Sequence, residues 1–141
     1  MKKYVIDTNA LISFVTDRNL DQQLKIESLF ESAAHLKSLI LCHQHVLTEF
    51  IFVMDRVYEV PKYSIKKMIA DLMETPGIEI IQEVDFKLVM IFWPDIIPDF
   101  GDAVIASVGK STKGSLIVTF DRKFSNQIKS LGLSICTFGD E

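Results

Sequence analysis

The stretch YVIDTNALI, residues 4–12, decides the fold expected for this chain. Residues 4–6 form a short apolar run that suits a buried strand, and Asp7, Thr8 and Asn9 are types that cap helices. A strand that passes directly into a helix begins a βα unit, and the same order recurs along the chain. The sequence therefore predicts an α/β fold around a central parallel sheet.

Apolar runs of strand length alternate with amphipathic stretches of helix length over the whole sequence. We expect about five strands, at residues 4–6, 39–42, 78–81, 116–120 and 134–138. We expect helices at residues 8–15, 21–36, 45–60, 64–74, 84–93, 99–110 and 122–131. Asp21 is the expected cap of the second helix, and Pro61 separates the third and fourth helices into a protruding helical hairpin. Without a repeat or linker, residues 1–141 should form one domain.

Composition restricts the class of protein. Hydrophobic residues make up 48% of the 141 residues and charged residues 24%, which are ordinary globular values. The sequence has no apolar segment of membrane-spanning length, and its N-terminus reaches Asp7 after only three apolar residues, too soon for a secretory signal. We therefore expect a soluble cytoplasmic protein. Cys42 and Cys136 share no metal-binding spacing and are expected to be buried free thiols.

The net charge of −4 argues weakly against nucleic acid as a partner. The distribution of charge qualifies this, because the C-terminal third carries a run of basic residues. A local basic surface for substrate binding is expected from Lys110, Lys113, Arg122 and Lys123, with Lys129 nearby in the sequence.

Two acidic residues directly follow predicted strands. Asp7 follows residues 4–6 and Asp121 follows residues 116–120. Parallel strands present their carboxyl ends at one edge of the sheet, where such folds bind ligands. Each aspartate could also serve only as the N-cap of the helix that comes next.

Glu49 is the most informative single acid, because it interrupts the strongly apolar helix expected at residues 45–60. Its neighbours one turn away include Val46 and Val53, which predicts a partly buried carboxylate. The alternative is a salt bridge to Arg56, but that residue lies two turns away.

Asp99 and Asp102 lie three residues apart at the start of the helix expected at residues 99–110. Asp99 fits the role of an N-cap, and Asp102 is followed by small apolar residues that would hold it near the strand ends. Carboxylates gathered in one cleft would repel one another unless a cation joined them. A hard divalent metal would resolve this conflict, and such sites commonly serve phosphate chemistry.

Four segments, VIDTNALI (5–12), VLTEFIFVM (46–54), FGDAVIAS (100–107) and IVTFDRKF (117–124), resemble in order the acidic motifs of PIN-domain ribonucleases. The resemblance is greatest to the VapC-type toxins of type II toxin-antitoxin pairs. It implies that the catalytic, metal-binding acids are Asp7, Glu49, Asp102 and Asp121. The supporting polar residues would be Asn9 and Thr119, with the role of Asp99 left open.

The resemblance also implies an activity: an endoribonuclease that binds one or two Mg²⁺ or Mn²⁺ ions and cleaves single-stranded or looped RNA with a metal-activated water. Phe100 and Phe120 are candidates to stack on bases, although core packing suits Phe120 better, and Trp93 is expected to pack. Apolar residues on more than one face of residues 46–72 predict a homodimer through the hairpin. By analogy, a cognate antitoxin would cover further apolar surface and insert a basic side chain among the acids.

Two other functions are compatible with parts of the sequence. A haloacid-dehalogenase-type phosphohydrolase also begins with an aspartate after its first strand, but it requires a second acid where this chain has Asn9. A non-catalytic PIN-like domain that binds RNA or protein remains open. The histidines His35, His43 and His45 form no ligand motif and are expected on the surface or in packing.

Overall fold

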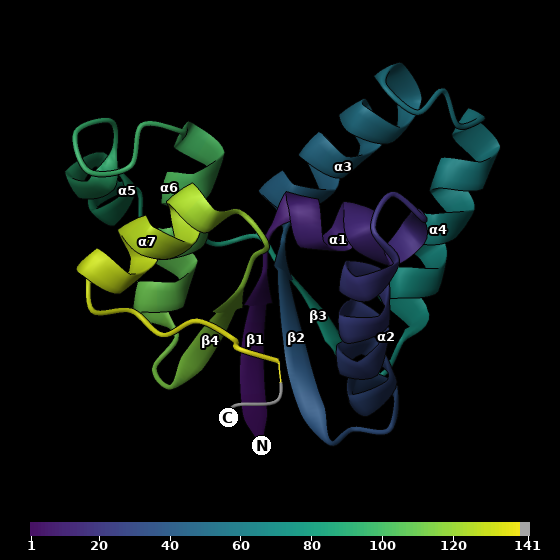
Figure 1. Ribbon diagram of the computed structural model, residues 1–141, viewed down its shortest axis with the longest axis horizontal. Coiled ribbons are helices and arrows are strands. Elements are labelled where there is room, and N and C mark those ends of the chain that lie inside the picture. Colours follow the sequence, from purple (N-terminus) through teal and green to yellow (C-terminus); the bar gives the residue numbers. More distant parts are fainter. Residues whose placement is uncertain (139–141) are drawn as a thin grey trace.

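A computed structural model describes residues 1–138 of the chain, and its centre is a parallel sheet (Figure 1). The strands are β1 (Lys2–Ile6), β2 (Ser38–His43), β3 (Ile78–Ile81) and β4 (Ser115–Val118). They lie in the order β3-β2-β1-β4, and every pairing is parallel. The predicted fifth strand is reduced to one parallel bridge between Ile135 and Ile117. The predicted α/β class is therefore confirmed. The sheet has four strands, which is close to the predicted number of about five.

The described residues form seven helices, which cover both faces of the sheet (Figure 1). Their bounds are α1 (Thr8–Val15), α2 (Leu20–Ala34), α3 (Gln44–Arg56), α4 (Lys62–Glu74), α5 (Phe86–Phe92), α6 (Phe100–Ser111) and α7 (Arg122–Ser130). Helices α1 to α4 lie on one side of the sheet, and α5 to α7 lie on the other. The prediction that Asp21 caps α2 is wrong. Asn19 is the N-cap and accepts from the Gln22 amide, while Asp21 lies in the first turn.

Because helices cover both faces, the central strands are apolar without alternation. Val5, Ile6, Ile40, Ile117 and Val118 are all buried. The connection into β3 needs a glycine, because a Cβ on Gly77 would lie 2.1 Å from the Ala33 carbonyl oxygen. Cys42 and Cys136 are both buried, as expected.

The helical hairpin consists of α3 and α4, which rise beyond the carboxyl ends of the strands and turn back (Figure 1). Pro61 is the N-cap of α4 and fixes where that helix begins. Several large apolar residues of this hairpin are exposed: Ile51, Phe52, Val57, Tyr58, Tyr63 and Met73. In the described part of the chain, no helix has the length and apolar character needed to cross a membrane.

Candidate active site

The carboxyl ends of β1 and β4 bring Asp7 and Asp121 to one edge of the sheet. Ile6 pairs with Val118, and the Asp7 amide donates to the Val118 carbonyl over 3.1 Å. Asp7 is also the N-cap of α1 and accepts from the Ala10 amide at 2.8 Å. Asp121 caps α7 in the same way, accepting from the Phe124 amide at 3.1 Å. Capping and placement at the ligand-binding edge are therefore properties of the same two residues.

Glu49 reaches the same edge from α3. Its Oε1 accepts a 2.6 Å hydrogen bond from the Thr8 hydroxyl, and the Nε2 of His45, one turn earlier, lies 3.5 Å away. Arg56 does not pair with Glu49. Arg56 instead lies 3.4 Å from Asp55 and over the Phe52 ring. The alternative role of Glu49 as the partner of Arg56 is therefore wrong.

The start of α6 supplies the remaining acids. Asp99 is the N-cap, as expected, and its Oδ1 accepts from the Asp102 amide at 2.9 Å. Gly101 between them allows α3 to approach. A Cβ on Gly101 would lie 2.9 Å from His45 Nε2 and 3.0 Å from Glu49 Oε2. Sequence reasoning missed both Gly101 and His45; a glycine in the first turn of a helix was the only available signal.

These residues line one pocket of about 200 Å³. Five carboxylates surround it, those of Asp7, Glu49, Asp99, Asp102 and Asp121, together with Thr8, Asn9, Gly101, Ile12, Val53 and Ile105. We call this pocket the carboxylate pocket. Thr119 is buried and contacts two lining residues: its hydroxyl accepts from the Asp121 amide at 3.1 Å and hydrogen-bonds to Asp7. All the predicted acids and their two supporting polar residues thus lie together.

Burial and mutual repulsion perturb two of these carboxyl groups. Burial raises the pKa of Asp7 from 3.8 to about 6, opposed by hydrogen bonds from Thr119 and Ala10 and assisted by nearby Asp121 and Glu49. Burial, followed by the charges of the four other acids, raises the pKa of Asp102 to about 7. Full ionisation at neutral pH therefore carries an electrostatic cost that a bound cation would remove.

The donor set fits Mg²⁺ or Mn²⁺, because it consists of carboxylate oxygens. Within residues 1–138, no three His, Cys, Asp or Glu side chains are already placed to hold one metal ion. A closed cage of this kind is not required for Mg²⁺, which keeps several waters and binds through one or two carboxylates together with substrate phosphates. The site is therefore compatible with an ion whose coordination the substrate completes.

The basic residues expected to bind substrate are divided between two edges of the sheet. Arg122 and Lys123 begin α7 next to Asp121 and are exposed. Lys110 lies in the last turn of α6, about 12 Å along the helix axis from Asp102 by helical rise. Lys113 precedes β4, at the amino end of the strand. Of these four residues, only Arg122 and Lys123 directly follow a residue that lines the carboxylate pocket, Asp121.

The histidine at the end of β2 has a structural role. His43 is buried and caps α3, since its Nδ1 accepts from the His45 amide at 3.0 Å. Burial lowers its pKa, so the neutral form that can accept this bond is favoured.

Of the aromatic residues considered as candidates to stack on bases, Phe120 stacks on Phe138, with ring centroids 5.2 Å apart.

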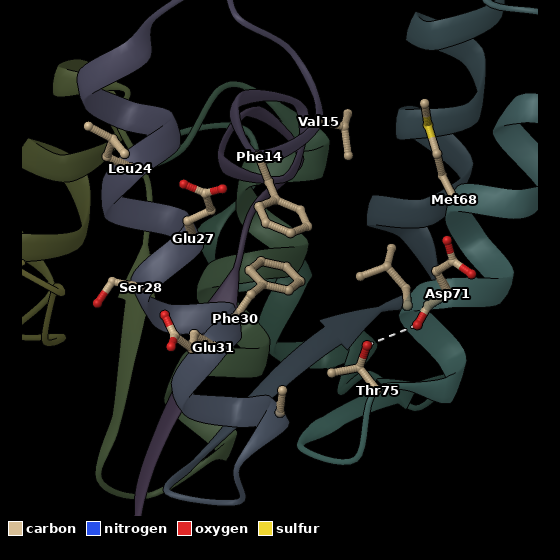
Figure 2. Close-up of a pocket in the computed structure, with 12 residues that line it drawn as sticks. Phe14, Val15, Leu24, Glu27, Ser28, Phe30, Glu31, Met68, Asp71 and Thr75 are labelled. Carbon is tan, nitrogen blue, oxygen red and sulfur yellow. Dashed lines mark hydrogen bonds between the residues drawn. The ribbon is translucent and has the colours of Figure 1, made fainter.

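A second, larger pocket of about 810 Å³ lies between α1, α2 and α4 (Figure 2). Stacked rings of Phe14 and Phe30, with centroids 4.0 Å apart, form part of its apolar floor. Glu27 and Glu31 of α2 and Asp71 of α4 lie along it, as Figure 2 shows. We call this the helical groove. Its apolar floor and acidic rim suit a partner with complementary apolar and basic groups.

The order of elements and the acids at one sheet edge define a class of protein. A family model described as the PIN domain matches residues 4–129, so the chain belongs to the PIN domain family. No curated protein matches the sequence.

Solved structures share this fold, among them a VapC toxin, a VapBC structure and a PIN domain endonuclease. Mycobacterium tuberculosis VapC20, described as a sarcin-ricin loop cleaving toxin, is 18% identical with a TM-score of 0.66; 94% of this chain and 98% of that chain are covered. VapBC2 from Rickettsia felis, bound to a DNA fragment from its promoter, is 17% identical with a TM-score of 0.66 and coverages of 95% and 97%. The PIN domain endonuclease Utp24 is 17% identical with a TM-score of 0.52 and coverages of 90% and 77%.

Proposed function

We propose that this chain is a Mg²⁺- or Mn²⁺-dependent endoribonuclease that cleaves single-stranded or looped RNA. The observation that carries the proposal is the gathering of five carboxylates around one small pocket at the carboxyl edge of the sheet. The PIN family and the toxin and endonuclease descriptions of its structural neighbours support the same activity.

Asp7, Asp102 and Asp121, with Glu49, would hold the metal, which when bound lowers the pKa of a coordinated water and offsets charge on the phosphate. Thr8 orients Glu49 through its 2.6 Å hydrogen bond. Thr119 links Asp7 to the backbone of Asp121. Arg122 and Lys123, beside the pocket, would attract the RNA backbone.

Cleavage of a fluorescent single-stranded RNA tests the activity directly. We expect cleavage with Mg²⁺ or Mn²⁺, none in excess EDTA, and a loss of at least about 100-fold in Asp7→Asn and Asp102→Asn. Asp85→Asn is the matched control, because Asp85 caps α5 outside the pocket. Metal-independent cleavage, or full activity in both pocket variants, would refute the proposal.

We further propose that the chain is the toxin of a toxin-antitoxin pair and that the antitoxin occupies the helical groove. The groove offers an apolar floor with Glu27, Glu31 and Asp71 around it, which suits an amphipathic helix carrying basic residues. Co-expression with the product of an adjacent small reading frame should yield a complex that suppresses cleavage.

A matched pair of substitutions tests the groove. Leu24→Glu should break the complex, because Leu24 lines the groove, whereas Leu20→Glu should not. Both leucines lie on α2 and both are 65% exposed, so the change in surface charge is equivalent. Equal binding of the antitoxin product to both variants would contradict this assignment.

We also propose a homodimer through residues 46–72. Phe52 is 60% exposed and lies among the other exposed apolar residues of α3 and α4. Sedimentation at micromolar concentration should give a two-chain species, and Phe52→Glu should convert it to a monomer. A wild-type monomer under these conditions would refute the dimer.

A further inference from the structure

Three aromatic rings lie together beside the carboxylate pocket. Phe86 begins α5, Trp93 is its C-cap, and Phe100 begins α6. The Phe100 ring meets Trp93 edge to face, with centroids 5.4 Å apart and an interplanar angle of 87°. Phe86 is tilted by 46° against Phe100, with centroids 6.1 Å apart. We call Phe86, Trp93 and Phe100 the aromatic platform.

The aromatic platform is continuous with the carboxylate pocket. Phe100 lies between Asp99 and Gly101, which both line that pocket. His45 contacts both the platform and the pocket: its ring centroid is 6.0 Å from that of Phe100, and its Nε2 is 3.5 Å from Glu49 Oε1. The Phe100 ring is therefore only one side chain away from a carboxylate of the pocket.

Two rings of the platform are accessible, and one of these, Trp93, is held in place by a hydrogen bond. Phe86 is 56% exposed and Trp93 is 36% exposed, whereas Phe100 is half-buried and contacts both rings. The Trp93 indole N–H donates to the Pro98 carbonyl over 3.0 Å, which satisfies its only polar group and holds the ring. Fixed aromatic surface with no unmet hydrogen bond suits stacking on another flat ring.

We propose that the aromatic platform binds an unpaired nucleobase of the RNA whose phosphate lies at the carboxylate pocket. This inference rests on the proposed function and adds how the substrate is held. Any base has a flat face that can stack on an aromatic ring, so the platform needs single-stranded RNA without needing a particular sequence. Continuity with the pocket favours a base over a second protein copy, because the rings adjoin the residues that would hold the RNA phosphate.

Trp93 makes the contact directly measurable, because it is the only tryptophan in the chain. Asp102→Asn protein with Mg²⁺ would be titrated with a short single-stranded RNA and with an abasic strand of equal length, following Trp93 emission and strand anisotropy together. We expect the RNA to change the emission and the abasic strand to leave it unchanged. Equal emission changes with both strands, or no emission change or no binding with RNA, would overturn the inference.

Substitutions at Phe86 separate stacking from general apolar contact. Phe86→Leu should weaken RNA affinity about 5- to 150-fold, the range for loss of one stacked base, whereas Phe86→Tyr should retain it. Ile91→Ala is the matched control, since Ile91 is an exposed apolar residue of the same helix without a ring. In cleavage assays the Phe86→Leu change should appear in KM, with kcat within about twofold.

The outcomes distinguish this inference from the nuclease proposal. RNA-dependent emission and a Phe86→Leu defect without any cleavage by the wild type would refute the nuclease and retain the stacking site. Cleavage by the wild type together with an unchanged KM in Phe86→Leu would support the nuclease and refute the stacking site. If Phe86→Leu and Ile91→Ala both lost affinity in step with a lower sedimentation mass, the platform would be an interface between copies and the inference would be wrong.

Discussion

Replacing Asp7 by asparagine should stabilise the metal-free protein while removing a proposed metal ligand. Asp7 is only 4% exposed, and burial raises its pKa from 3.8 to about 6. Because the folded pKa is the higher one, the stabilising effect of the neutral carboxyl is complete below about pH 4 and is lost as the pH rises through about 6. Asparagine stays neutral and keeps the oxygen that accepts from the Ala10 amide.

The magnitude follows from the pKa difference. A difference of about two units corresponds to about 3 kcal/mol once the pH is well above 6. Asp7→Asn should therefore raise the free energy of unfolding by about 3 kcal/mol at pH 8 and by about 2 kcal/mol at pH 5. Asp85→Asn, at an exposed helix cap, should change it by less than about 0.5 kcal/mol at either pH.

Urea unfolding in EDTA, followed by circular dichroism at pH 5 and pH 8, measures these differences. Adding Mg²⁺ should stabilise the wild type and narrow the gap at pH 8, because the ion binds only the folded carboxylates. If Asp7→Asn were destabilised equally at both pH values, Asp7 would be a simple helix cap with no electrostatic cost, and the reasoning would be refuted.

Three further predictions concern how the pocket is built and used. Thr8→Val should lower cleavage about 10- to 100-fold with little change in stability, since it removes the hydrogen bond that orients Glu49. Gly101→Ala should lower activity in the same assay while the protein stays folded, because the new Cβ would displace only the ends of flexible side chains. Arg122→Glu with Lys123→Glu should weaken RNA binding about 10-fold or more and flatten its salt dependence.

Each of these predictions has a matched control. Thr48→Val changes an exposed threonine on α3 and should leave cleavage unaffected. Gly77→Ala should instead unfold or strongly destabilise the protein, because its Cβ would meet the Ala33 backbone. Lys110→Glu with Lys113→Glu should barely change RNA binding. If replacing Lys110 and Lys113 weakened RNA binding as much as replacing Arg122 and Lys123, the RNA would not be bound mainly by the basic residues that follow Asp121.

The sequence was sufficient to predict the fold and the positions of the aspartates at the sheet edge, because both depend on local patterns. A buried parallel strand is apolar throughout, and the residue after it must begin the next connection. Asp7 and Asp121 are therefore recognisable from their positions after apolar runs. The length of the fifth strand was overestimated, because an apolar run at residues 134–138 does not reveal that its pairing is limited to the single bridge of Ile135.

Contacts between distant segments came only from the tertiary structure. The hydrogen bond between Thr8 and Glu49 spans 41 residues, and the approach of His45 to Gly101 depends on how α3 and α6 pack. Neither residue pair has a periodic signature in the sequence. The placement of Lys110 and Lys113 away from the pocket likewise depends on the direction of α6 and β4.

The amino-acid sequence by itself determined which carboxylates this protein has and which strand ends and helix starts carry them. Only the tertiary structure decided how deeply they are buried and which of them repel one another, and so why the pKa of Asp7 rises to about 6 and that of Asp102 to about 7. The physical reason is that desolvation and Coulomb repulsion depend on distances through space, whereas capping and strand length depend on neighbours in the chain.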